Sequence, residues 1–296
     1  MSLPNFLCIG APKSATTSLF EILKQHPEIG LSSFKEPHFF DNDANWNQGI
    51  EWYRKSYFLE LEQKVIGEFT PSYLSNMICP LRIKRTLGDD VKFILLLRNP
   101  VDRAYSHYLH TKRDEHETLS FLDALREEEA RLHNFQKKKD NISYSRFCYL
   151  ESGKYATHLR SYLEYFDQKQ FCIILFDDFV KNRKEVVNEI LSFLNVSTEL
   201  DLNLDVFANQ ASEARSIKLK KFMKRKSLLT EILKFLIPSL ELRQRIRNRL
   251  HDRNNRIISK EPLTRDERKF CFETYFSDEI YDLEKILNRK LNIWKI

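Results

Sequence analysis

The chain has 296 residues, of which 42% are hydrophobic and 30% are charged. This balance is typical of a globular protein, and the length suffices for one large domain or for a domain with a lid. The formal net charge of +6 favours an anionic ligand or surface, and it leaves nucleotide, nucleic acid and membrane open as partners.

The cysteines and the apolar runs argue against several classes of protein. The five cysteines are scattered without paired spacing, which favours free thiols in a reducing compartment over a disulfide or zinc framework. No apolar run approaches the roughly 20 residues of a membrane span, and the N-terminus lacks the basic region of a signal peptide. We therefore expect a cytoplasmic protein, or a catalytic domain cut from a membrane-anchored parent. The cysteines are Cys8, Cys79, Cys148, Cys172 and Cys271.

The stretch that organises the chain lies near its N-terminus. Residues 6–9 form a short apolar run, which predicts a buried strand, and residues 10–12 break it. Residues 13–17 form a small, hydroxyl-rich turn, and a helix pattern follows with Leu19 on its inner face. A strand, a tight turn and a helix N-terminus can bind phosphate, because backbone N–H groups and the positive helix end face the anion. Lys13 adds a positive charge, so we expect a phosphate site here.

This turn is not a Walker A loop, which needs Gly, four residues and then Gly-Lys-Ser/Thr. Here Lys13 follows Gly10 by three residues, and the Ser/Thr cluster comes after the lysine. A turn rich in Ser and Thr that only caps a helix remains the alternative.

Two ionisable residues, Glu36 and His38, flank Pro37 inside the aromatic stretch 34–41. The proline disfavours helix at Glu36, so we expect an extended backbone on which the two side chains share a face. A carboxylate and an imidazole near apolar rings are candidates for acid–base catalysis. A structural histidine beside a solvated carboxylate is the alternative, and these residues alone favour it.

Residues 91–97 form the most strand-like run in the chain, and their nearly continuous apolarity predicts a central parallel strand. P-loop hydrolases and kinases commonly end such a strand with an aspartate that serves a Mg²⁺ site. Here Arg98 follows, which indicates direct contact with an anion rather than with a metal; a surface charge is the alternative. A helix is expected from residue 101, with Ser106 two turns into it.

Other elements follow from the same periodicities. Asp177 and Asp178 are the only Walker-B-like feature, and plain loop carboxylates are the preferred interpretation. We expect an exposed connection at residues 136–143. Further strands are expected at residues 29–31, 65–69 and 171–176, and helices at residues 76–87, 118–132, 155–165, 184–194, 262–275 and 278–287.

Residues 215–256 are strongly basic and hold few acids, with an apolar stripe at residues 229–237. They suit a lid, a surface for an anionic acceptor, a membrane-surface helix or a nucleic-acid face; a solvated helical lid is the plain alternative. No repeats or low-complexity linkers interrupt the chain. We therefore expect a single domain over residues 1–296, with 215–256 as a basic helical lid or insertion.

Five motifs together resemble sulfotransferases that use 3′-phosphoadenosine 5′-phosphosulfate (PAPS), and most closely the heparan-sulfate branch of that family. The resemblance extends from Phe6 to Trp294 and is weakest in the basic segment. The motifs are Gly-x-x-Lys-Ser-x-Thr-Thr at residues 10–17, Lys-Glu-x-His-Phe-Phe-Asp at 35–41, Gly-Ile-x-Trp-Tyr at 49–53, Gly-Glu-Phe-Thr-Pro-Ser-Tyr at 67–73 and Arg-Asn-Pro-x-x-Arg-Ala-x-Ser at 98–106.

The resemblance implies a set of donor-binding residues. Lys13 would stabilise charge on the leaving 5′-phosphate, and Arg98 with Ser106 would clamp the 3′-phosphate. Family loops usually carry glycine at the position of Ala15, and an alanine fits there if the residue is helical but not at positive φ. The full donor set is Lys13, Ser14, Ala15, Thr16, Thr17, Ser18, Arg98, Ser106, Tyr155, Arg256 and Lys260.

On the acceptor side, the resemblance implies that Glu36 is the base and that His38 lies beside the acceptor hydroxyl. We expect no metal, because a sulfuryl group carries less charge than a phosphoryl group and the protein supplies the cations. The implied acceptor-binding residues are Lys35, Glu36, His38, Thr70, Ser72 and Tyr73.

We therefore expect an α/β fold, with a parallel sheet of about five strands flanked by helices and related to nucleotide kinases. The expected activity is sulfuryl transfer from PAPS to a hydroxyl or amine of a glycan or other small acceptor, with adenosine 3′,5′-bisphosphate (PAP) as product. The alternatives are a small-molecule kinase that uses Asp177 or Asp178 for Mg²⁺, and a non-enzymatic anion- or nucleic-acid-binding module. We do not expect a nucleic-acid partner. The acceptor and the oligomeric state stay open.

Overall fold

The computed structural model describes residues 3–138, 140–206 and 262–295, together with the backbone of residues 212–214 and 255–257. The chain divides into two compact units, Met1–Ala208 with Leu263–Ile296, and Asn209–Pro262. Most of the expected basic lid lies outside the described residues, so its helical form and the single-domain interpretation stay predictions.

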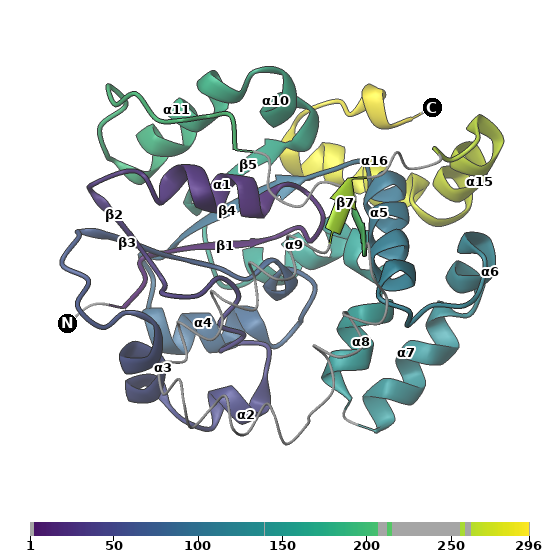
Figure 1. Cartoon of the computed structure of the whole chain (residues 1–296), viewed down its shortest axis with the longest axis horizontal. Coiled ribbons are helices and arrows are strands. Elements are labelled where there is room, and N and C mark those ends of the chain that lie inside the picture. The colour runs from purple at the N-terminus through teal and green to yellow at the C-terminus, as the bar shows by residue number, and fades with distance from the viewer. Residues whose placement is uncertain (1–2, 139, 207–211, 215–254, 258–261, 296) are drawn as a thin grey trace. The chain divides into compact units, whose positions relative to one another are not determined.

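The larger unit is built on a sheet of five parallel strands (Figure 1). The strands are β1 (Phe6–Gly10), β2 (Ile29–Leu31), β3 (Val65–Phe69), β4 (Lys92–Leu97) and β5 (Phe171–Leu175). Their order is β2-β3-β1-β4-β5, so β1 lies in the centre between β3 and β4. This confirms the predicted α/β fold with a parallel sheet.

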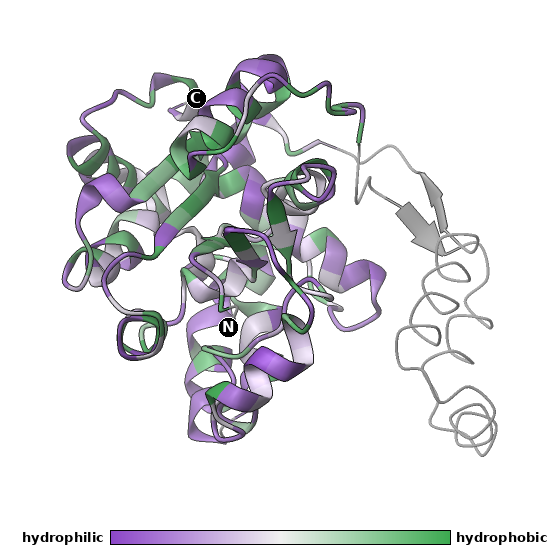
Figure 2. Ribbon diagram, turned by 90° about the vertical axis from the view of Figure 1, so that its left-hand side faces the viewer, coloured by the Kyte–Doolittle hydropathy of each residue, from purple (hydrophilic) through white to green (hydrophobic). Residues whose placement is uncertain are grey.

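The central strand is buried on both of its faces, as its unbroken apolar run predicts. Leu7 and Ile9 belong to one core cluster, whereas Phe6 and Cys8 belong to the other, because successive side chains of a strand point to opposite faces. In Figure 2 the strands are mostly hydrophobic, while the helices mix hydrophobic and hydrophilic residues. The sheet is therefore the middle layer of a helix–sheet–helix sandwich.

The helices cover the two faces of this sheet (Figure 1). On one face, α1 and α11 pack against β1 and β4. Helices α5, α9 and α16 contribute to the core of the other face. The helix bounds are α1 (Thr16–Leu23), α2 (Asp43–Trp46), α3 (Ile50–Tyr57), α4 (Cys79–Leu87), α5 (Pro100–Arg113), α6 (Phe121–Arg126), α7 (Glu128–Lys137), α8 (Asn141–Phe147), α9 (Tyr155–Leu163), α10 (Phe176–Lys181), α11 (Arg183–Leu194), α15 (Arg265–Tyr275) and α16 (Ser277–Leu287).

Two sequence-based expectations about these elements were wrong, and two short helices were missed. The single helix expected at residues 118–132 is two helices, and the first begins only after Ser120, which caps it. The connection expected at 136–143 contains the end of α7 and the start of α8, because the Asp140 carboxylate accepts from the N–H of Ser143 and caps a new helix. The aromatic segment 45–57 holds α3 and the end of α2, which sequence analysis did not predict.

The smaller unit contains an antiparallel pair, β6 (Ser212–Ala214) and β7 (Asn255–Ile257). Arg256 pairs with Glu213 in the backbone register. Lys260 lies outside the described residues. The donor-binding roles of these two basic residues stay predictions.

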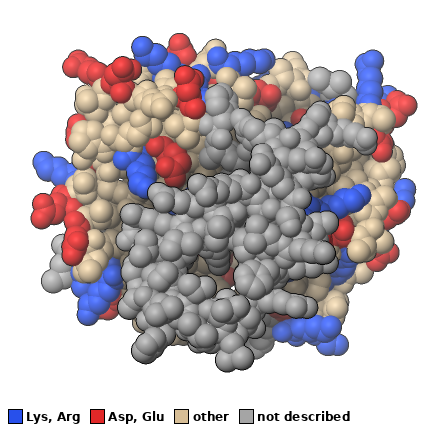
Figure 3. Space-filling view, viewed as in Figure 1, with Lys and Arg blue, Asp and Glu red and all other residues tan. Residues whose placement is uncertain are grey.

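The described surface mixes charges of both signs. Around the rim of the face in Figure 3, Lys and Arg side chains lie interspersed with Asp and Glu side chains. Among the described residues, no helix combines the length and apolarity that crossing a membrane requires.

Candidate donor and acceptor site

The predicted site residues converge at the carboxyl ends of β1, β3 and β4, the three central strands of the sheet. The loop that holds Lys13 follows β1, Thr70 follows β3 and Arg98 follows β4. In open parallel sheets, ligands bind in the crevice outside these strand ends. The fold therefore brings together residues that are up to 85 positions apart in the sequence.

The loop after β1 has an unusual backbone. Lys13 has φ of 69° and Ala15 has φ of 64° with ψ of 18°, so both residues are left-handed. An alanine was expected to fit at this position only if Ala15 were helical, and it is not. Ala15, the residue before α1, has the left-handed conformation that glycine adopts most easily. Ala15 also has no side-chain acceptor that could cap α1.

Ser14 is fully buried in this loop; the Tyr155 hydroxyl interacts with it, but its Oγ makes no hydrogen bond of good geometry among the described residues. A buried hydroxyl without a partner carries a cost of about 1–3 kcal/mol, which a bound polar ligand would relieve. The loop therefore fits an anionic group at the start of α1. Thr16, Thr17 and Ser18 form the first turn of that helix, as predicted for a phosphate site.

Arg98 connects the end of β4 to this loop. Its Nη1 donates to the Lys13 carbonyl over 3.2 Å, and its guanidinium carbon lies 4.7 Å from the centre of the Phe176 ring. Its Nε is buried without a partner among the described residues. Burial lowers the pKa of the guanidinium below its usual value. Arg98 is thus held in a fixed place with a donor unused, which suits an anion.

The residues around Arg98 fix it and the helix that follows. The Asn99 side chain accepts from the first N–H groups of α5, the helix that carries the buried Ser106. Its Nδ2 donates to the Trp294 carbonyl over 3.2 Å. The Tyr155 hydroxyl, itself buried, donates to the Arg98 carbonyl over 2.9 Å. Tyr155 therefore helps to fix the backbone of Arg98.

Lys13 lies close enough to α5 for its charge to act there. The pKa of His107, the neighbour of Ser106, is well below its usual value, first because of burial and then because of the positive charges of Arg103 and Lys13. The structure thus brings together the loop lysine, the arginine at the strand end and the Ser106 helix, as the resemblance implied.

On the acceptor side, Glu36 and His38 do approach each other, but not on an extended backbone. Their φ angles are 63° and 52°, so the expectation of an extended segment was wrong. The reason is a tight loop in which the N–H of Glu36 donates to the Phe69 carbonyl at the end of β3 over 2.9 Å. His38 Nε2 lies 3.8 Å from Glu36 Oε2, and Glu36 forms an ion pair with Lys35.

Asp41 completes a chain of polar groups that sequence analysis did not single out. Its carboxylate lies 3.0 Å from His38 Nδ1 and accepts from the Ser72 hydroxyl over 2.6 Å. Burial lowers the pKa of His38, but the hydrogen bond to Asp41 and the negative charges of Asp41 and Glu36 outweigh burial and raise it. The imidazole is therefore oriented by Asp41, and its other nitrogen faces Glu36.

Thr70 and Tyr73 differ from the other predicted acceptor residues, because both side chains are fully buried. The Thr70 hydroxyl donates to Glu68 over 2.5 Å, and the Tyr73 hydroxyl also bonds to Glu68. Of the three residues predicted in this loop, the half-buried Ser72 is the one that approaches the half-buried His38, the neighbour of the exposed Glu36. Sequence analysis missed Glu68, although a carboxylate inside a buried strand was a signal.

Asp177 and Asp178, the Walker-B-like pair, are engaged elsewhere. They lie in the first turn of α10 rather than in a loop. Asp177 accepts from the Trp294 indole over 3.1 Å, and Asp178 pairs with Arg289 over 2.8 Å. Both carboxylates therefore hold the C-terminal residues in place. Among the described residues, no group of three or more His, Cys, Asp and Glu side chains is arranged to hold a metal.

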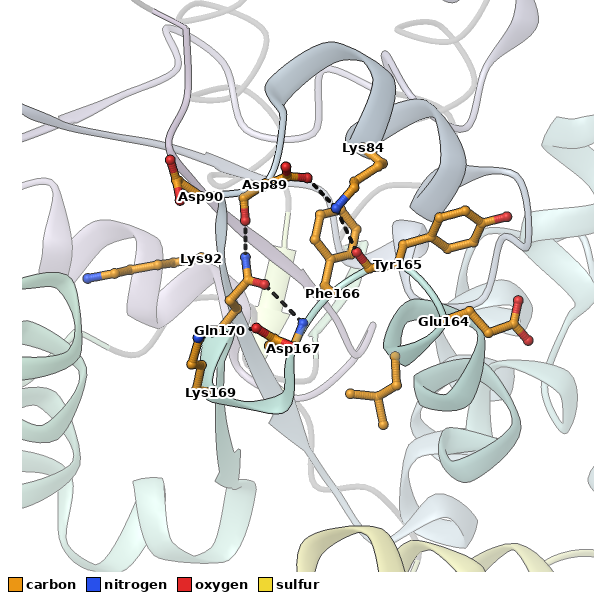
Figure 4. A pocket seen from close by; sticks show the side chains of 11 residues that line it. Lys84, Asp89, Asp90, Lys92, Glu164, Tyr165, Phe166, Asp167, Lys169 and Gln170 are labelled. Atoms are coloured by element: carbon orange, nitrogen blue, oxygen red, sulfur yellow. Dashed lines mark hydrogen bonds and ion pairs between the residues drawn. The ribbon is translucent and has the colours of Figure 1, made fainter.

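A pocket of about 560 Å³ lies at the opposite, amino-terminal end of β4 and β5 (Figure 4). Its polar groups bond to one another: Lys84 Nζ pairs with Asp89 and donates to the Tyr165 carbonyl over 3.0 Å, and Gln170 donates to the Asp89 carbonyl over 2.7 Å. The predicted donor and acceptor residues do not line it. The predicted residues lie instead at the carboxyl ends of the strands, so the site there stays a prediction.

Comparison with known proteins identifies the family of this chain. Residues 3–236 match the family described as the sulfotransferase domain. The chain belongs to this family. A solved structure, that of a sulfotransferase from Alicyclobacillus acidocaldarius, superposes with a TM-score of 0.72 and 26% identity over 100% of both chains.

Curated relatives of this sulfotransferase domain include enzymes named for heparan sulfate. Human heparan sulfate glucosamine 3-O-sulfotransferase 5 is 28% identical over 198 residues, 66% of this chain and 54% of the relative. The membrane-associated sulfotransferase kil1 of Dictyostelium discoideum is 45% identical over 111 residues, 36% of this chain and 23% of the relative. The chain thus spans about half the length of the heparan sulfate enzymes that it matches.

Proposed function

We propose that this protein transfers a sulfuryl group from PAPS to a hydroxyl group of a glycan. The observation that carries the proposal is that Lys13 and Arg98 meet at the ends of β1 and β4, while the exposed Glu36 is bonded through its N–H to the end of the neighbouring strand β3. The two cations would bind the anionic donor, and the carboxylate would take the proton of the acceptor. The relatives named for heparan sulfate favour a glycan as the acceptor.

The donor side would be held by two groups of residues. Lys13 and the turn from Ser14 to Ser18 would bind the 5′-phosphosulfate, because Ser14 Oγ is buried without a good partner and α1 has no side-chain cap. Arg98 and Ser106 would bind the 3′-phosphate, with Tyr155 holding the Arg98 carbonyl. PAPS, when bound, supplies the sulfuryl group on a phosphate leaving group. Roles for Arg256 and Lys260 remain part of the proposal.

Lys13 would also lower the barrier to transfer. A cation that faces the leaving phosphate stabilises the negative charge that develops there, and a partly desolvated site strengthens that effect. The left-handed backbone at Lys13 and the hydrogen bond from Arg98 to its carbonyl fix the position of the backbone from which the lysine side chain extends. We propose no metal for this step, since Lys13 and Arg98 would supply the positive charge on the donor side.

Glu36 would act as the general base on the acceptor side. Its carboxylate is exposed, so an acceptor hydroxyl can reach it, and it would take the proton as the oxygen attacks. Asp41 orients His38 from the other side, which suits an imidazole that binds or positions the same hydroxyl. Lys35 and Ser72 would contact the acceptor next to this pair.

The kinase alternative is weaker, because Asp177 and Asp178 are bonded to Trp294 and Arg289 rather than free for Mg²⁺. The non-enzymatic alternative depends on residues 215–256, most of which lie outside the described residues. Neither alternative gives a role to the carboxylate of Glu36 and the imidazole of His38 at the end of β3.

A nucleotide panel tests the proposal. We expect PAP, in the absence of Mg²⁺, to raise the melting temperature of the full chain, because binding to the native state alone stabilises it. ATP without Mg²⁺ should raise it much less, since ATP lacks the 3′-phosphate. Stabilisation by ATP only when Mg²⁺ is present, with no response to PAP, would favour the kinase and overturn the proposal.

A further inference from the structure

Glu68 is a fully buried carboxylate at the carboxyl end of β3, and the proposed reaction leaves it without a role. Three hydroxyl groups surround it, one from α3 and two from the turn that follows β3. Tyr53 of α3 donates to one carboxylate oxygen, Thr70 donates to the other over 2.5 Å, and Tyr73 bonds to the same group. Burial raises the pKa of both tyrosines well above the usual value, so each phenol keeps its proton.

Tyr73 carries this network to the acceptor loop. Its hydroxyl oxygen accepts from the backbone N–H groups of Phe39 over 2.9 Å and of Phe40 over 3.3 Å. A hydroxyl that gives its only proton to Glu68 keeps its lone pairs for these two amides. A continuous path of hydrogen bonds therefore runs from the buried carboxylate to the residues that directly follow His38.

Aromatic packing links the same residues, Phe39 and Phe40, to Tyr53 and Tyr73. Phe39 stacks on Tyr53 with ring centres 4.2 Å apart and planes at 13°, and Phe40 meets Tyr73 edge-on at 5.4 Å. Both phenylalanines are buried to 1% exposure or less. The two rings anchor one end of the loop, while Glu36 and His38 remain accessible at the other.

The loop needs such an anchor, because Glu36 and His38 both have left-handed φ angles. Sparsely populated backbone conformations persist only where the surrounding structure enforces them. The Asn45 amide contributes by donating to the carbonyls of Pro37 over 3.1 Å and of His38 over 2.9 Å. Tyr73 holds the N–H groups on the far side of the same turn.

We propose that Glu68 and Tyr73 are positioning residues for the acceptor side: Glu68 orients the Tyr73 hydroxyl, and Tyr73 fixes the loop that presents Glu36 and His38. This inference rests on the proposed function for its catalytic consequence. Neither residue touches the acceptor, since both are fully buried.

The test compares Tyr73→Phe with a matched control, Tyr53→Phe. Each variant removes one hydroxyl that bonds to Glu68, and each keeps the aromatic ring and its packing. Of these two tyrosines, only Tyr73 accepts hydrogen bonds from the backbone N–H groups of Phe39 and Phe40. We expect backbone amide exchange at Phe39 and Phe40 to be about tenfold faster or more in Tyr73→Phe, and near the wild-type rate in Tyr53→Phe.

The catalytic readout is transfer from PAPS to a heparan sulfate oligosaccharide. Tyr73→Phe should lower kcat by roughly tenfold, because a small misplacement of a base is costly, and PAP affinity should stay within about twofold. Tyr53→Phe should keep kcat. Equal exchange rates and equal kcat in the two variants would overturn the positioning role. Absence of transfer by the wild type would overturn the proposed function. The amide exchange rates at Phe39 and Phe40 would still show whether Tyr73 fixes the loop.

Discussion

At the scale of single residues, the loop after β1 shows how backbone conformation and residue type can disagree. Ala15 stands in a left-handed conformation that costs an L-residue roughly 1–2 kcal/mol and glycine almost nothing. The sequence revealed the departure from the usual family glycine but not the φ angle, because φ there depends on how the loop joins β1 to α1.

Ala15→Gly should therefore stabilise the protein, by up to about 1 kcal/mol after the greater flexibility of glycine in the unfolded chain is subtracted. Urea unfolding of the two proteins measures the change. Ala130→Gly is the matched control, since Ala130 is exposed within α7, and a glycine there should cost about 1 kcal/mol. Equal destabilisation by both substitutions would contradict a left-handed Ala15.

Glu68 gives a second prediction at this scale, on pH. Burial raises its pKa to about 7, although hydrogen bonds from Thr70, Tyr53 and Tyr73 oppose the rise and the charge of Asp41 adds to it. Because the folded pKa lies above the unfolded value of about 4.3, the folded state binds the proton more tightly. The stability that this proton contributes is full below about pH 4.3 and is lost as the pH rises to about 7.

Glu68→Gln should remove this part of the pH dependence. The free energy of unfolding should fall between pH 5 and pH 8 by less in the variant than in the wild type, with a difference of at most about 3 kcal/mol. Glu128, whose pKa burial also raises to about 7, contributes equally to both proteins and cancels in this comparison. Equal falls in both proteins would show that Glu68 does not titrate in this range.

Residues that act through local motifs were predictable, whereas residues that act through the fold were not. Lys13 and Arg98 follow strands, so short stretches of sequence pointed to them, whereas Glu36 was singled out only by the family resemblance. Glu68 and Asp41 acquire their roles from partners up to 31 positions away, such as Tyr53 and Ser72. A single sequence does not show such contacts.

At the scale of elements, nearly continuous apolar runs predicted β1, β4 and β5 well, because parallel strands buried on both faces have few polar positions. The helices α2 and α3 were missed because they are short and aromatic, and their packing rather than periodicity defines them. The connection between β4 and α5 gives the clearest prediction about a mutation, because Arg98 directly follows the strand and Asn99 caps the helix.

Arg98→Ala should weaken PAP binding about tenfold or more, because a charge-assisted hydrogen bond to phosphate contributes about 1.5–3 kcal/mol. AMP, which lacks the 3′-phosphate, should lose much less. Calorimetric titration with both nucleotides measures the two changes, with Arg113→Ala at the far end of α5 as the control. Equal losses for PAP and AMP would mean that Arg98 does not recognise the 3′-phosphate.

At the scale of the whole molecule, charge is distributed unevenly along the chain. Residues 215–256 hold 14 of the 48 Lys and Arg residues and only 3 of the 42 Asp and Glu residues, so the rest of the chain is net acidic. The described surface accordingly mixes both signs (Figure 3). Composition therefore indicated an anionic partner, but only the fold showed that cations and a carboxylate meet at one end of the sheet.

The central claim is sulfuryl transfer to a glycan with Glu36 as the base. The most direct measurement is the movement of label from PAPS, labelled in its sulfuryl group, to a heparan sulfate oligosaccharide by the wild type, Glu36→Gln and His38→Asn. We predict transfer by the wild type and a kcat lower by roughly 10²–10⁴-fold in Glu36→Gln at unchanged PAP affinity, with a milder loss in His38→Asn. Turnover near the wild-type rate in Glu36→Gln, together with none in His38→Asn, would contradict the account and assign the base to the imidazole.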